Sequence, residues 1–119
     1  IEGTYIQIND GTISITASDD GINAAAKSTS LDVVIELNGG TITIVMGSGD
    51  TDAVDANGSI YVNGGNINIT GNSSFDYDTT GELNGGTVIV NGSQITEMPA
   101  QMQGGGMQGG MQGGKGMRG

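Results

Sequence analysis

The fold of this chain is decided by the stretch Asn38-Gly39-Gly40-Thr41-Ile42-Thr43-Ile44, which occurs four times in slightly different forms. The other copies start at Asn9, Asn63 and Asn84, and each joins a Gly-containing corner to a run of alternating residues. Self-similarity at a period of a few tens of residues is the signature of a stacked-repeat fold. Nothing between the copies sustains a 3.6-residue apolar period, so the repeat predicts a β-solenoid and not helical repeats.

The corner of each copy has a structural explanation. Gly adopts positive φ without a Cβ penalty, and Asn also tolerates the left-handed region. We expect the corner asparagines to hydrogen-bond to one another from coil to coil and to have no ligand role. These residues are Asn9, Asn38, Asn63 and Asn84.

Composition narrows the possible functions. The chain has 119 residues, which is at most one domain. It contains 24 Gly, one Phe and no Trp, so a core built on aromatic residues is excluded, whereas branched aliphatics can fill a narrow solenoid. It has no Cys and no His, which removes disulfides, thiol catalysis and histidine acid–base chemistry.

The charge is strongly acidic, with 13 Asp and Glu against 3 Lys and Arg. Lys27 is the single basic residue before Lys115 and Arg118. Binding to nucleic acid by phosphate neutralisation is therefore excluded as a function. No apolar run is long enough to span a membrane, so we expect no membrane insertion.

Each coil is predicted to contain three short strands. After each corner, one aliphatic column points inward, and it consists of Ile13, Ile42, Ile67 and Val88. The strand before the corner contributes Ile6, Ile35 and Ile60. The third strand aligns Ile22 with Val54 and Phe75. Stacking in register at about 4.8 Å would turn these columns into the core.

The third strand also carries an acidic edge. Its outward positions hold Asn23, Asp55 and Asp76, with Asp20 and Asp52 close by. Carboxylates about 5 Å apart repel one another, by several kcal/mol at an effective dielectric near 20. Either these side chains extend into solvent, or a hard cation bridges them. Oxygen-only donors favour calcium over transition metals, and calcium is the cofactor that this pattern predicts.

Catalysis is the less favoured interpretation of the same carboxylates. Eliminative cleavage of a uronate needs a basic side chain, and Lys27 is the one candidate in the body. Hydrolysis needs a pair of carboxyl groups with different pKa values, and an open acidic surface offers little desolvation. We therefore expect a protein that is not an enzyme, with no catalytic residues.

The strand after each corner presents hydroxyl and amide groups outward. Thr12, Thr41 and Thr43 are the candidate sugar-binding residues on this face, although exposed Thr is also favoured by β-propensity alone. Tyr5 and Tyr61 are predicted to be exposed on the neighbouring face, where their rings can stack on pyranose rings.

A change in composition marks the end of the repeats. The sequence predicts a solenoid over residues 1–96 and a low-complexity Gly/Met/Gln tail over residues 97–119. The tail has no apolar period and is expected to be disordered. The chain opens on Ile1-Glu2-Gly3, in the middle of what should be a coil, so we expect it to be the C-terminal part of a longer solenoid.

These phrases resemble a known family. Residues 12–25, the corner at residues 38–44 and the segment Phe75-Asp76-Tyr77-Asp78 are similar to repeats of the secreted clostridial carbohydrate-binding domain proteins. The resemblance implies a right-handed, single-stranded parallel β-helix like that of pectate lyases, which binds cellulose or acidic sugars such as polygalacturonate, contains calcium and has no established lyase activity. It further implies calcium coordination, or nearness to it, at Asp19, Asp20, Asn23, Asp52, Asp55, Asp76 and Asp78.

The sequence therefore predicts an all-β, right-handed parallel β-helix of about four coils. We expect a polysaccharide-binding module, assisted by calcium, that acts outside the cell or at its surface. A structural module that associates through open coil ends is the alternative. Its partners would be further copies of the chain or upstream coils, which would pair with the N-terminal end.

Overall fold

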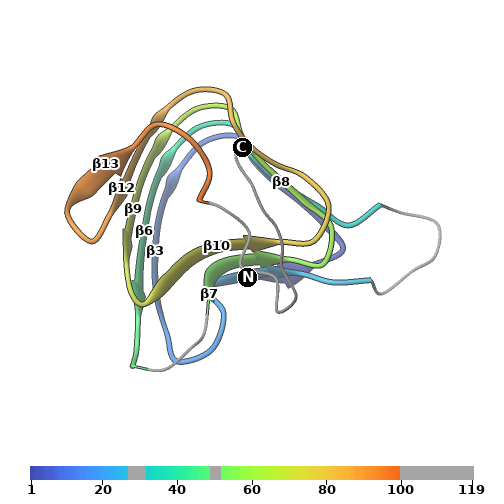
Figure 1. Cartoon of the computed structure of the whole chain (residues 1–119), viewed down its shortest axis with the longest axis horizontal. Coiled ribbons are helices and arrows are strands. Elements are labelled where there is room, and N and C mark those ends of the chain that lie inside the picture. Colours follow the sequence, from blue (N-terminus) through green and yellow to red (C-terminus); the bar gives the residue numbers. More distant parts are fainter. Residues whose placement is uncertain (27–31, 49–51, 100–119) are drawn as a thin grey trace.

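The computed structural model describes residues 1–26, 32–48 and 52–99. Lys27 and residues 100–119 of the expected tail lie outside the described residues. In the described part the chain forms strands and no helix, and each coil has a triangular outline with one strand on each side (Figure 1). None of the described residues forms a helix that could span a membrane.

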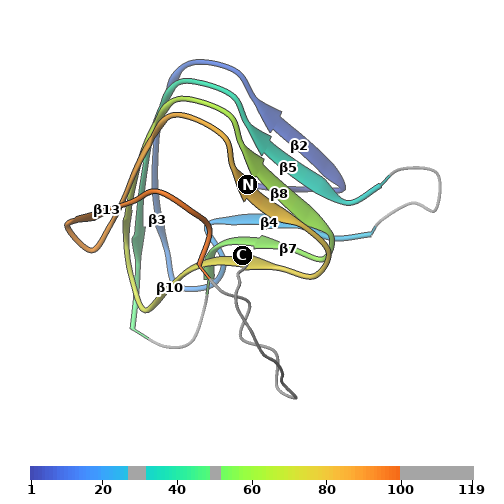
Figure 2. The same cartoon turned by 45° about the horizontal axis from the view of Figure 1, so that its top comes forward.

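The three sides of the triangle are three sheets whose strands come from successive coils (Figure 2). Sheet A contains β1 (Glu2–Gly3), β4 (Ile22–Ala24), β7 (Asp52–Ala56) and β10 (Ser73–Tyr77). Sheet B contains β2 (Tyr5–Ile8), β5 (Val34–Leu37), β8 (Ser59–Val62) and β11 (Gly81–Leu83). Sheet C contains β3 (Thr12–Ala17), β6 (Thr41–Met46), β9 (Asn66–Thr70), β12 (Thr87–Val90) and β13 (Ser93–Ile95).

The predicted β-solenoid is confirmed. Strands β1 to β12 pair in parallel within their sheets, as one strand per coil requires. Within the described residues there are three complete turns, and β11 and β12 begin a fourth, which refines the expected number of about four. On the N-terminal side, the outermost strands of sheets A, B and C are β1, β2 and β3, respectively.

The aliphatic columns lie in the predicted register. On sheet C, Ile42 pairs with Ile13 on one side and Ile67 on the other, and Ile67 pairs with Val88. Ile42, Ile67 and Val88 are buried, and Ile13, in the outermost strand, is half-buried. The third strand likewise stacks Ile22, Val54 and Phe75 inside the triangle. The core is therefore a narrow stack of branched aliphatic side chains.

Two features shape the corners, a glycine with positive φ and a ladder of asparagine hydrogen bonds. The second Gly of the corner has positive φ, for example 91° at Gly40. The corner asparagines form the predicted ladder of side-chain hydrogen bonds. Asn38 donates to Asn9 at 2.9 Å, Asn63 donates to Asn38 at 2.7 Å, and Asn84 donates to Asn63 at 2.9 Å.

The C-terminal edge of sheet C is covered by a hairpin. Asn91 and Gly92 both have positive φ and connect β12 to β13, which runs antiparallel to it. Two residues with positive φ are the requirement of a type I′ turn, for which Asn-Gly is the preferred sequence. Beyond β13, Met98 packs against the core and the Tyr77 hydroxyl donates to the Pro99 carbonyl at 3.0 Å.

The register of sheet C allows the assignment of inward and outward positions to be tested by substitution. Replacing buried Ile42 with Ala should lower the free energy of unfolding by about 2–5 kcal/mol, because it leaves a cavity within the stack. Thr43 is the next residue and faces outward, so Thr43→Ala should cost less than about 0.5 kcal/mol. Denaturant unfolding of the two variants measures both values. Equal losses would show that the inward and outward positions are assigned wrongly.

Candidate functional site

The outer surfaces of the three sheets differ in chemistry because each coil places its polar residues at the same offsets. Outward side chains on sheet C carry no charge, those on sheet B include tyrosine and glutamate, and those on sheet A include several aspartates. On β3, β6, β9 and β12 of sheet C the outward residues are Thr12, Ser14, Thr16, Thr41, Thr43, Val45, Asn66, Asn68, Thr70, Thr87 and Ile89.

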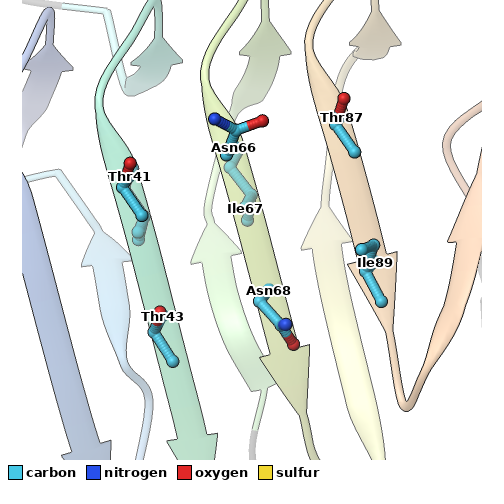
Figure 3. Close-up of a pocket in the computed structure, with 8 residues that line it drawn as sticks. Thr41, Thr43, Asn66, Ile67, Asn68, Thr87 and Ile89 are labelled. Atoms are coloured by element: carbon cyan, nitrogen blue, oxygen red, sulfur yellow. The ribbon is translucent and has the colours of Figure 1, made fainter.

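A shallow depression lies on the outer surface of sheet C. It has a volume of about 300 Å³ and is lined by Thr41, Ile42, Thr43, Asn66, Ile67, Asn68, Thr87 and Ile89. Figure 3 shows the outward side chains of this lining in rows that cross β6, β9 and β12. One row consists of Thr41, Asn66 and Thr87, which pair directly in the sheet. Hydroxyl and amide groups therefore recur along the stack at the spacing of the strands.

Two of the three predicted threonines line this depression. Thr41 and Thr43 do so, whereas Thr12 lies on the outermost strand β3, paired with Thr41 but outside the lining. The other outward residues of the lining were not among the candidate site residues, and they are Asn66, Asn68, Thr87 and Ile89. Their offset from the corner is the same as that of Thr41 and Thr43, so the repeat contains the signal that identifies them.

Tyr5 and Tyr61 lie on sheet B, on a different face from the threonines. The Tyr5 hydroxyl donates to Glu36, which also accepts from Gln7 at 2.9 Å and from Asn38 at 3.4 Å. The Tyr5 hydrogen bond, followed by that of Gln7, lowers the pKa of Glu36, and the same Tyr5–Glu36 bond raises the pKa of Tyr5. Tyr5 is 45% exposed, so its ring remains accessible although its hydroxyl is engaged.

A cluster of carboxylates occupies sheet A and the turn before it. Asp20, Asp52 and Asp55 each bring one carboxylate oxygen within 4.8 Å of the others. Asp20 accepts a hydrogen bond from the Asp52 backbone N–H at 3.2 Å, and the Ser73 hydroxyl donates to the Asp52 carboxylate. All three side chains are half-buried. We call Asp20, Asp52 and Asp55 the aspartate cluster.

The remaining predicted metal ligands lie around the aspartate cluster. Asn23 and Asp76 pair with Asp55 from the strands on either side of it. Asp19 and Asp78 are exposed and do not belong to the group of close oxygens. The structure thus brings three of the seven predicted residues together and places two more beside them. Calcium binding by these residues stays a prediction.

The electrostatics of the aspartate cluster disfavour full ionisation. Burial raises the pKa of Asp55 to about 7, and the charges of Asp20 and Asp76 contribute in the same direction. Burial also raises the pKa of Asp52, against the effect of the Ser73 hydrogen bond. The described residues include no Lys or Arg that could balance these charges, because the three basic residues are Lys27, Lys115 and Arg118.

Stability should consequently depend on pH. The folded chain holds a proton on Asp55 more tightly than the unfolded chain, whose pKa is near 3.8. The stabilising contribution of this proton is therefore fully present below pH 3.8 and is lost as pH rises through about 7. In metal-free buffer the melting temperature should fall over this range, and Asp55→Asn should flatten the fall. Asp78→Asn, at an exposed position outside the cluster, is the control. Parallel pH profiles for Asp55→Asn and wild type would contradict the raised pKa.

Comparison with known protein families gives a match over most of the chain. The family whose members are described as "Carbohydrate-binding domain-containing protein" matches residues 1–82. This range contains β1 to β10 and most of β11, and with them the aspartate cluster, both tyrosines and the corners of the three complete turns. No curated protein and no solved structure matches the chain significantly.

Proposed function

The chain belongs to the carbohydrate-binding domain-containing protein family, and on that premise we propose that it is a non-catalytic polysaccharide-binding module acting outside the cell or at its surface. The observation that carries the proposal is the depression on sheet C, where hydroxyl and amide groups recur from strand to strand. The polysaccharide lies across β6, β9 and β12, and its hydroxyl groups exchange hydrogen bonds with Thr43, Asn66 and Asn68.

The chemistry of the depression supports binding to an uncharged polysaccharide such as cellulose. Its lining has no charged side chain, so no ion pair selects an acidic sugar there. Its side chains extend from paired strands, which hold their backbones rigid before the ligand arrives and so reduce the entropic cost of binding. Ile89 adds apolar surface beside the polar groups, against which the C–H face of a sugar ring can pack.

Tyr5 and Tyr61 supply a second contact area around the corner from sheet C. The asparagine ladder separates the two faces, so a chain that leaves the depression over this corner meets amides before it reaches the tyrosine rings. Because the Tyr5 hydroxyl is already bonded to Glu36, the contribution of Tyr5 is stacking by its ring face.

The binding assignment is tested by a variant of the depression. Thr43→Ala combined with Asn68→Ala should weaken retention in cellulose affinity electrophoresis about tenfold, equivalent to about 1.4 kcal/mol, because it removes two outward hydrogen-bonding groups. Thr70→Ala, on the same strand as Asn68 but outside the lining, is the matched control. Equal retention of the double variant and the control would refute the assignment of sheet C.

Two further measurements distinguish a binding module from an enzyme and from an assembly module. A binding module leaves its polysaccharide intact, so soluble sugar should not accumulate during incubation, and acidic sugars should be retained without unsaturated products. An assembly module would associate through β2 and β3, which are outermost in their sheets. In that case mobility would depend on protein concentration in the absence of sugar.

Binding of acidic sugars such as polygalacturonate requires a cation, and we assign that role to calcium at the aspartate cluster. The support is chemical: three carboxylates converge without a basic partner among the described residues, and oxygen donors suit calcium. The raised pKa of Asp55 means that a bound cation would relieve an unfavourable charge. Asn23 and Asp76 are positioned beside the cluster as further oxygen donors.

Calcium should stabilise the fold if it binds the folded coils alone. At a concentration of about 100 times its dissociation constant it would add about 2.7 kcal/mol to the free energy of unfolding. The melting temperature should rise with calcium and fall with a chelator, and Asp55→Asn should weaken both responses. Asp78→Asn should leave them intact. A melting temperature that neither chelator nor millimolar calcium changes would remove calcium from the account.

A further inference from the structure

Five Asn-Gly dipeptides occur in this chain, and they begin at Asn38, Asn57, Asn63, Asn84 and Asn91. Asn-Gly is the dipeptide in which deamidation is sterically easiest, because Gly leaves the following backbone nitrogen open to approach. The reaction needs a side chain that is free to rotate and a following N–H that is not held in a hydrogen bond. The five dipeptides differ in both respects.

Three of these asparagines are restrained by the asparagine ladder. Asn63 donates to Asn38 at 2.7 Å and accepts from Asn84 at 2.9 Å, so its amide is held on both sides. Asn38 is held in the same way between Asn9 and Asn63. The next backbone N–H is also engaged at two corners, since Gly64 donates to the Leu37 carbonyl and Gly85 to the Val62 carbonyl, each at 3.3 Å.

The fourth asparagine, Asn91, is restrained in the hairpin turn. Asn91 accepts from the Gly71 N–H at 3.0 Å and donates to the Gly71 carbonyl at 2.8 Å. Its side chain therefore bridges to the previous coil through both of its polar atoms. Rotation of Asn91 towards Gly92 would break both hydrogen bonds.

Asn57 lacks these restraints. It lies between β7 and β8, is exposed, and its side chain makes no hydrogen bond within the described part of the chain. The Gly58 N–H has no acceptor among the described residues, whereas the Gly58 carbonyl accepts from the N–H groups of Asp78 and Thr79. We propose that Asn57 is the site at which this protein deamidates, and that the hydrogen bonds of the other four asparagines protect them.

The chemistry needs only water. The Gly58 nitrogen attacks Cγ of Asn57, a new N–Cγ bond forms, and the Cγ–Nδ2 bond breaks. The proton lost by the Gly58 nitrogen leaves with Nδ2 as ammonia, and the product is a succinimide ring. Water then opens the ring at one of its two carbonyl groups, which gives either aspartate or isoaspartate at position 57.

The position of Asn57 gives the reaction a structural consequence. Isoaspartate lengthens the main chain by one methylene at a corner where Gly58 is tightly packed, since a Cβ on Gly58 would come within 2.1 Å of the Val33 carbonyl oxygen. Either product also adds a negative charge two residues after Asp55 in the sequence, to a chain that is already strongly acidic. Deamidated protein should therefore melt at a lower temperature than the intact chain.

Peptide mapping by mass spectrometry of the full chain tests the proposal. During incubation in mildly alkaline buffer, below the melting temperature, Asn57 should deamidate at least about ten times faster than each of the other four. That ratio corresponds to about 1.4 kcal/mol of activation free energy. Asn57→Gln should remove this first product. An equal or faster reaction at another Asn-Gly, or no reaction at Asn57 before the others, would overturn the proposal.

A second variant tests the protective role of the ladder. Asn38→Ala removes the acceptor of the Asn63 amide, so deamidation at Asn63 should accelerate while the rate at Asn91 stays unchanged. Asn91 thus serves as an internal control for general unfolding, which would accelerate both sites. An unchanged rate at Asn63 in folded Asn38→Ala would show that the ladder gives no protection.

Discussion

Direct backbone contact at the corners is the constraint on which the rest of the structure depends. A Cβ on the first corner Gly would meet the Asn carbonyl oxygen of the preceding coil at 2.4 Å for Gly39, 2.6 Å for Gly64 and 2.7 Å for Gly85. Successive coils can therefore approach at these points only without a side chain. Since each corner also fixes where the next strand begins, it sets the register of every position on sheets B and C. A slip by one residue would exchange the inner and outer faces.

This register explains how so short a chain carries three chemically different surfaces. The interior needs only one aliphatic side chain at every second position, as with Ile42 and Ile44. The positions between them are released from packing and can carry hydroxyl and amide groups on sheet C, tyrosine and glutamate on sheet B, and aspartate on sheet A. Because each coil repeats the same offsets, a group that is weak alone, such as the Thr41 hydroxyl, recurs as a column. A column of this kind suits a polymeric ligand, and it is what connects the fold to the proposed sugar binding.

The sequence predicted the features that the repeat determines. The inward columns, the strand pairing and the asparagine ladder follow from offsets within a copy, and the structure confirms all three. Features that occur once were harder to predict. The hairpin at Asn91-Gly92 has the same dipeptide as the corners, so its different role shows only in the strand that folds back after it. The separation of Tyr5 from the threonines depends on how three sheets meet at angles. Which aspartates converge depends on side-chain orientation in the turn at Asp20, which periodicity does not report.

The central claim is that the uncharged outer surface of sheet C is where this family member meets its polysaccharide. Backbone amide chemical shifts measured by NMR during titration with a soluble cello-oligosaccharide test it most directly, because they report on all three faces at once. The account predicts that the largest shifts fall on β6, β9 and β12, at Thr43, Asn66 and Asn68 and their neighbours, with little change at the aspartate cluster in calcium-free buffer. Shifts confined to sheet A or sheet B, with sheet C unaffected at saturation, would contradict it.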